Sequence, residues 1–231
     1  MDATVAVPSV AGGRHKPDWK RARAAARVLR EDPNRTEKAF EIAQALEPDW
    51  QERGFERLTA RPEGRRLFER RPDLLAALKD RAVLQAMPED SFGRAFLDHI
   101  DRYDLSPTAL VELGRQGRSG APEEGPAWFA ERYYLLHDLR HVLAGYGADP
   151  LGETLVLWFS HAQDGGLSNR LLMVSSLQAR LQTERVGGRF VFACLRAWLR
   201  GRQANWLDVM PFEDLLPLPL AQVRRLAGIR P

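Results

Sequence analysis

The sequence predicts an all-α protein, a single multi-helix domain whose helices pack around an apolar core or groove. Runs of Val, Ile, Thr and Tyr that alternate with polar residues are absent, whereas Ala, Leu, Arg and Glu recur at helical spacing. Proline and glycine separate these helical stretches from one another. With 231 residues, of which 44% are hydrophobic, the chain is long enough to bury a sizeable core.

The predicted helices begin at Pro17, which suits the first turn of a basic helix that carries a stripe of alanines. A second clear start is Asp149-Pro150, with the aspartate as N-cap and the proline at the first helical position. Gly145 and Gly147 end the helix before it. We expect helices over residues 17–32, 32–46, 89–105, 127–147, 150–162, 167–184 and 188–204, short helices over 48–88, and a short helix at the end of 205–229.

Two segments bear on the domain organisation. Residues 1–16 read as a disordered N-terminal tail, and residues 17–231 as the helical domain. Residues 114–126 form the clearest loop, with four glycines and two prolines. This loop either subdivides the domain or is a simple long connection.

Several function classes are excluded or left without support. No run approaches the ~20 apolar residues of a membrane-spanning helix, and the N-terminus lacks the pattern of a signal peptide, so we expect a cytoplasmic protein. The single cysteine, Cys194, lies in an apolar run and reads as a small buried residue rather than a nucleophile. The net charge is +3 with clustered arginines, which suits an anionic membrane surface or an acidic partner. Nucleic-acid-binding motifs are absent, so we expect no nucleic acid partner.

The stretch HDLRHVLAGYGADPLGE, residues 137–153, contains the candidate metal-binding residues. His137 and His141 are one helical turn apart on the same face, and Asp138 is about 60° from His141 in projection. The short connection that follows can return Glu153, in the first turns of the next helix, toward the histidines. Imidazole and carboxylate groups of this kind could bind a divalent metal and leave coordination positions open.

The alternative is a polar seam between two helices, without a metal. The other three histidines are not expected to be metal ligands. His15 lies in the tail, and His99 and His161 are interpreted as capping or surface residues.

The spacing HD-x-x-H, then eleven residues and E, resembles the signature of the coenzyme Q (ubiquinone) biosynthesis protein four family. Four other segments also resemble that family, in the family's order, so that the likeness covers roughly residues 18–229. They are EDPNRTEKAFEIAQAL, ARPEGRRLFERRPDL, MPEDSFGRAFLDHIDRYDLSP and PLPLAQVRRLAGI.

The resemblance implies a mostly helical protein with a divalent metal, described as zinc, at His137, Asp138, His141 and Glu153. It implies oxidative decarboxylation at C1 of a polyprenylated 4-hydroxybenzoate-derived ring, with Glu153 and Asp138 as catalytic residues. It also implies a peripheral place on the inner membrane among other ubiquinone biosynthesis enzymes, and we expect a homo-oligomer, a dimer. The alternative function is a non-catalytic prenyl-lipid-binding scaffold with a structural metal.

Two further expectations follow from a prenylated ligand and a membrane. An apolar groove for the prenyl chain would draw on Leu135, Leu139, Leu155, Trp158, Phe159, Leu171, Leu172 and Met173, each of which reads equally as plain core. The first helix, with Trp19 among arginines, is either an anchor on anionic lipid or a solvated helix packed through its alanines.

Overall fold

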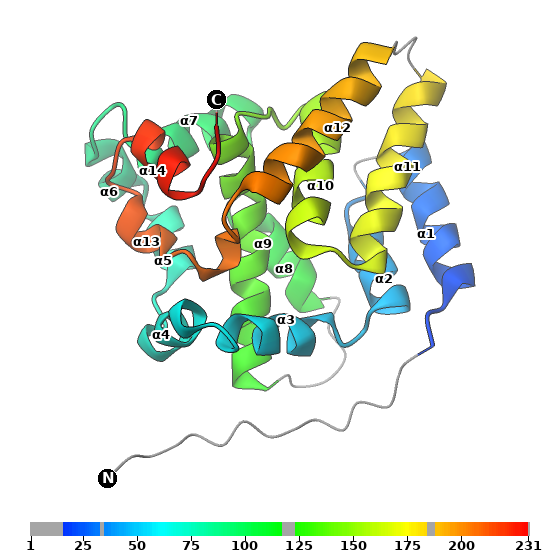
Figure 1. Ribbon diagram of the computed structural model, residues 1–231, viewed down its shortest axis with the longest axis horizontal. Coiled ribbons are helices and arrows are strands. Elements are labelled where there is room, and N and C mark those ends of the chain that lie inside the picture. The colour runs from blue at the N-terminus through cyan, green and yellow to red at the C-terminus, as the bar shows by residue number, and fades with distance from the viewer. Residues whose placement is uncertain (1–15, 33–34, 117–122, 184–187, 231) are drawn as a thin grey trace.

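The computed structural model is built from helices throughout the residues that it describes, which are 16–32, 35–116, 123–183 and 188–230 (Figure 1). The prediction of an all-α fold is confirmed. The elements are α1 (Trp19–Glu31), α2 (Glu37–Leu46), α3 (Trp50–Thr59), α4 (Pro62–Arg70), α5 (Leu74–Lys79), α6 (Arg81–Ala86), α7 (Phe92–Tyr103), α8 (Ala109–Gln116), α9 (Glu124–Ala144), α10 (Pro150–Asp164), α11 (Leu167–Thr183), α12 (Gly188–Gln203), a 3-10 turn η1 (Leu207–Val209), α13 (Phe212–Leu215) and α14 (Leu220–Leu226).

Helix α9 is the centre of the fold, and the other helices surround it (Figure 1). Its 21 residues are buried over most of the circumference, as expected for a helix enclosed by others. The largest core cluster joins α9 to α5, α6, α7 and the C-terminal α13 and α14, with residues such as Phe92, Leu136, Phe159 and Phe212 fully buried. This cluster draws on the chain both before and after the predicted loop.

The first helix is packed through its alanines. Ala22, Ala25 and Ala26 are buried against Ile42 and Leu46 of α2, and leucines of α11 pack on the same cluster. The small alanine side chains allow the two helices to approach closely. Of the two interpretations of this helix, the structure therefore supports a helix packed through its apolar stripe, with Arg21, Arg23 and Arg27 exposed.

The predicted loop 114–126 is shorter in the structure at both ends. Gly114 belongs to α8 and Gly125 to α9. A Cβ atom at Gly114 would lie 2.1 Å from the Tyr134 ring, and one at Gly125 would lie 2.5 Å from the Phe55 ring. These glycines permit close packing inside helices, so reading them as turn residues was wrong. A subdivision of the domain at 114–126 stays a prediction, since 117–122 lie outside the described residues.

Helix α12 buries one face and exposes the other. Phe190, Cys194 and Ala197 are buried, and burial raises the pKa of the Cys194 thiol to about 11, which fits the predicted inert cysteine. The opposite face exposes Phe192 and Leu195. Among the described residues, no helix is long and apolar enough to cross a membrane. The predicted tail lies, apart from Lys16, outside the described residues.

Candidate metal centre and its cavity

The turn between α9 and α10 brings three of the four predicted ligands together. Helix α9 ends at Gly145, whose φ of +72° is a left-handed conformation that glycine adopts without strain. Asp149 caps α10 by accepting hydrogen bonds from the backbone N–H groups of Leu151 and Gly152. A Cβ atom at Gly152 would lie 1.7 Å from the carbonyl oxygen of Gly147, so only glycine allows this close return of the chain. The turn thereby directs the first turn of α10 toward the end of α9.

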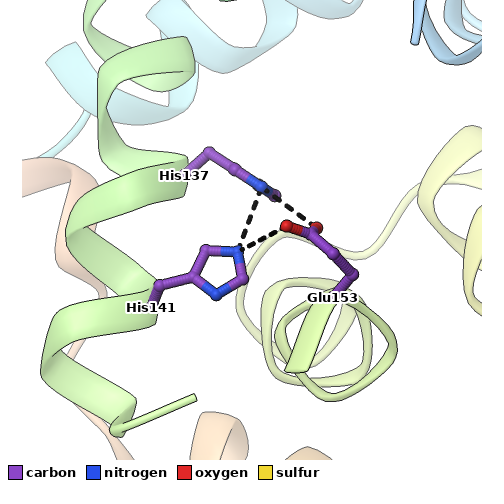
Figure 2. Close-up of side chains that lie close together, drawn as sticks. All are labelled: His137, His141 and Glu153. Carbon is purple, nitrogen blue, oxygen red and sulfur yellow. Dashed lines mark hydrogen bonds and ion pairs between the residues drawn. The ribbon is translucent and has the colours of Figure 1, made fainter. Parts of the chain in front are cut away.

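Three side chains meet between the two helices (Figure 2). The Nε2 atoms of His137 and His141 are 3.2 Å apart. The Glu153 carboxylate lies 3.4 Å from His137 Nε2 and 3.3 Å from His141 Nε2. Ligands at about 2.0–2.1 Å from a tetrahedral zinc ion are about 3.3–3.4 Å from one another. The donor set and its spacing therefore fit a divalent metal.

A hydrogen bond to the backbone determines which ring nitrogen of His141 carries the proton. Its Nδ1 lies 3.3 Å from the carbonyl oxygen of Tyr146, which can only accept a hydrogen bond, so Nδ1 carries the proton. The lone pair is then on Nε2, which faces the other two ligands. In metal-binding histidines, the ring nitrogen that does not bind the metal typically donates to such a backbone carbonyl.

The site is closed on one side and open on the other. The side chain of His141 is 1% exposed, whereas His137 is 29% and Glu153 is 42% exposed. Burial opposes the charge of Glu153, but its interactions with His137 and His141 outweigh it and hold the pKa of this carboxyl below its usual range. Burial also opposes the charge of His137, and Glu153 overcomes it, so the pKa of His137 is raised. Glu153 and His137 thus form a charged pair on the accessible side of the site.

Asp138 lies outside the group whose ligand atoms are within 4.8 Å of one another. Its carboxyl borders the cavity described below, and burial raises its pKa, against the opposing effect of both histidines. Its predicted roles as a ligand and a catalytic residue stay predictions.

Two further histidines have defined places. The ring of His99, on α7, stacks on that of His141 with centroids 5.4 Å apart. Burial and the neighbouring His141 lower the pKa of His99 to about 4, so it packs as a neutral ring. Reading His99 as a cap or surface residue was wrong, since sequence spacing does not show that α7 crosses α9 here. His161 Nδ1 lies 3.3 Å from the Gly165 carbonyl at the end of α10, in agreement with a capping role.

A cavity of about 1760 Å³ is bordered by His137 and Glu153 and extends among α1, α2, α3, α8, α10 and α11. Its apolar wall includes Phe40, Leu110, Leu113, Leu157 and Leu172. Of the eight residues expected to form a groove, Leu172 is on this wall, while Leu135, Leu139 and Phe159 lie in the main core. A groove exists, but α2 and α8 supply much of the lining that was expected from α9 and α10.

A buried ion-pair cluster borders the same cavity and was not predicted. Arg140 Nη1 lies 2.9 Å from Asp164 Oδ2, and Arg140 Nη2 lies 3.3 Å from Asp208 Oδ2. The guanidinium is also 5.1 Å from the centroid of the Tyr133 ring. The three charged residues come from α9, α10 and η1, so no spacing in the sequence relates them.

Comparisons with known proteins identify the family of the chain. The family model described as "Coenzyme Q (ubiquinone) biosynthesis protein Coq4" matches residues 21–231. The mitochondrial ubiquinone biosynthesis protein COQ4 homolog of Mus musculus is 31% identical over 172 residues, which are 74% of this chain and 62% of the mouse protein. That of Bos taurus is 29% identical over 170 residues, 73% of this chain and 61% of the bovine protein. The chain thus spans about three fifths of the length of these relatives.

The fold has a solved counterpart. A crystal structure of a protein assigned to ubiquinone biosynthesis, from Nostoc punctiforme, superposes with a TM-score of 0.66 at 15% identity. The superposition covers 94% of this chain and the whole of that one, and it shows a shared fold. With the family model matching nearly the whole sequence, the chain belongs to the coenzyme Q (ubiquinone) biosynthesis protein Coq4 family.

Proposed function

We propose that this protein catalyses oxidative decarboxylation at C1 of a polyprenylated 4-hydroxybenzoate-derived ring, leaving a hydroxyl group there. The observation that carries the proposal is the cluster of His137, His141 and Glu153, at metal-ligand spacing, beside a large and partly apolar cavity that His137 and Glu153 border. The two histidines and Glu153 would hold a divalent metal, which we take to be zinc. Such a cation supplies positive charge for a carboxylate or phenolate oxygen of the ring.

The chain's own residues would orient the ring and manage protons. The cavity wall around Phe40, Leu110 and Leu113 excludes water from the prenyl chain. Asp138 and Glu153 border the cavity and are in position to exchange protons with the ring substituents. Zinc has no redox chemistry, so the oxidant we assign is dioxygen. The aromatic acid, water and dioxygen then give the phenol, carbon dioxide and hydrogen peroxide, which balances atoms and electrons.

A non-catalytic scaffold that binds prenyl lipid is the second candidate function. It is favoured by the complete burial of His141 and by the way the three ligands join α9 to α10, since a metal there would fix two helices together. In this case the same residues would control assembly with other ubiquinone biosynthesis enzymes.

We further propose a peripheral place on an anionic membrane, with the outer face of α12 as the contact. Phe192 is 67% exposed, and Leu195 and Leu199 lie one and two turns further along the same face. Arg196 and Arg202 lie exposed on this helix and complement anionic lipid. A second copy of the chain is the alternative occupant of this face.

The first prediction concerns the metal. Purified protein is expected to contain stoichiometric metal by elemental analysis, and His137→Ala and Glu153→Ala are expected to lose it. His161→Ala is the matched control, because this histidine lies outside the cluster and should leave the metal content unchanged.

Metal-loaded wild type should then release carbon dioxide from a prenylated 4-hydroxybenzoate. Absence of metal after reconstitution would remove the basis of both functions. Metal without turnover, together with loss of partner assembly in His137→Ala, would instead favour the scaffold.

A further inference from the structure

The cluster of Arg140, Asp164 and Asp208 contains hydrogen-bonding atoms that the protein does not use. Arg140 and Asp208 are each 2% exposed, and Ser160, one turn before Asp164 on α10, is 7% exposed. Within the described part of the chain, Arg140 Nε, Ser160 Oγ, Asp164 Oδ2 and Asp208 Oδ1 have no hydrogen-bond partner. Buried polar atoms without partners are costly, and all four residues border the cavity. They are therefore placed to bind a group inside it.

A structural role does not account for these atoms. The segment around η1 is already held to α10 by Gln163, which accepts a hydrogen bond from Leu207 N and donates to the carbonyl oxygen of Gly201. The ion pairs of Arg140 use its Nη atoms, so Nε remains. The unused donor and acceptors are thus additional to what connects the helices.

Their position relative to the metal ligands is set by helix geometry. Glu153, Leu157, Ser160 and Asp164 recur along one face of α10, and all four border the cavity. Ser160 follows Glu153 by two turns, about 10 Å along the helix axis. On α9, Arg140 follows His137 by one turn. Along α10, the cluster therefore lies about 10 Å from Glu153 on the same face of the helix.

The charge of the cluster favours a neutral ligand group. One guanidinium faces two carboxylates, and burial together with the nearby Asp164 raises the pKa of Asp208 to about 7. Near neutral pH, the positive charge of Arg140 is therefore largely balanced by the carboxylate charge that remains on Asp164 and Asp208. A charged ligand group would have no partner of opposite charge in this cluster. A hydroxyl group can accept from Arg140 Nε and can pair with Asp208 Oδ1, donating to it when Asp208 is ionised and accepting from it when Asp208 is protonated. Ser160 Oγ can act in either direction.

We propose that Ser160, Arg140 and Asp208 form a recognition site for a hydroxyl group on the head of the molecule that occupies the cavity, opposite the oxygen substituent held at the metal ligands. This inference rests on the proposed function, because it takes the ligand to be a prenylated hydroxybenzoate. It adds the residues that select the ring hydroxyl.

Two probes that differ in one group test the site. 3-Geranyl-4-hydroxybenzoate and 3-geranylbenzoate are titrated into the zinc-loaded full chain, and the ratio of their dissociation constants is measured by calorimetry. We expect the hydroxylated probe to bind at least about tenfold more tightly to the wild type, since a site built for a hydroxyl rejects the analogue that lacks it. Ser160→Ala and Asp208→Asn should each reduce the ratio at least about threefold.

Ser175→Ala is the matched control. Ser175 is 4% exposed and borders the cavity on α11, away from the cluster, so the ratio should be unchanged. Circular dichroism verifies that each variant is folded. A ratio near one in the wild type, or a ratio that neither variant alters, overturns the hydroxyl site while the proposed ligand class stands. Failure of both probes to bind the wild type overturns the ligand class and the hydroxyl site together.

Discussion

The carboxyl group of Asp208 links the stability of the folded protein to pH. Burial and the neighbouring Asp164 raise its pKa from 3.8 to about 7, although Arg140 partly opposes the shift. A carboxyl with a raised folded-state pKa stabilises the fold fully below its unfolded pKa, and this contribution is lost as pH rises through about 7. The loss is at most about 1.4 kcal/mol per pH unit between these values.

The second prediction is that Asp208→Asn reduces the fall in unfolding free energy between pH 5 and pH 8. The measurement is urea denaturation of chelator-treated protein at both pH values. Asp214→Asn is the control, because Arg70 lowers the pKa of this exposed carboxyl and its protonation lies below the tested window. Equal slopes in the wild type and Asp208→Asn would show that Asp208 is ionised throughout.

Single residues differ in how far the sequence revealed them. His137, His141 and Glu153 are joined by one turn and one short connection, so their types and spacing were sufficient to bring them together. Arg140 and Asp208 are 68 residues apart, and their pairing depends on where η1 packs against α9. Sequence reasoning finds local ligand sets more readily than contacts made by tertiary packing.

At the scale of elements, the C-terminal end of α9 is held by two arginines from later in the chain. Arg224 donates to the carbonyl oxygens of Val142 and Leu143, and Arg200 donates to that of Ala144. These bonds satisfy carbonyls that a helix end leaves free. Arg200 also donates to the Tyr146 hydroxyl, and the Tyr146 carbonyl orients His141. The end of α12 thereby supports a proposed metal ligand, His141, that it does not touch.

The third prediction is that Arg200→Ala weakens metal binding by about tenfold or more, as is typical when a partner behind a ligand is removed. Tyr146→Phe, which deletes only the hydroxyl, should have a smaller effect in the same direction. Affinity is measured by competition with a chromophoric chelator. Arg202→Ala, an exposed arginine on the same helix, provides the comparison. An affinity equal to that of Arg202→Ala would mean that the turn holds His141 without Arg200.

Over the whole molecule, helical periodicity predicted most of the helices, but it predicted neither α8 nor which helix faces would meet. The alanines of α1 are buried because α2 and α11 pack on them, and glycines of α8 and α9 admit aromatic rings from other helices. Such packing buries helix faces that the sequence alone did not identify as contact surfaces. The outer face of α12 is different, because Phe192, Leu195 and Leu199 remain exposed after the described chain has folded.

The last prediction concerns this face. Replacing Phe192 and Leu199 by aspartate should lower binding to vesicles containing phosphatidylglycerol by about tenfold or more, because it removes exposed apolar area and adds charge that anionic lipid repels. Binding of the wild type should weaken with added salt, since the arginines of α12 contribute to it. Val83→Asp, at a residue 51% exposed on α6, is the matched control and should bind like the wild type.

Co-sedimentation with vesicles and sedimentation equilibrium, performed on the same variants, separate the two occupants of α12. Reduced vesicle binding with an unchanged oligomeric state identifies the membrane. Unchanged vesicle binding together with a shift from dimer to monomer assigns the face to a second copy of the chain. Because both outcomes concern a surface of α12 whose opposite face packs on α10, neither should alter the metal content, which serves as the check that the fold is intact.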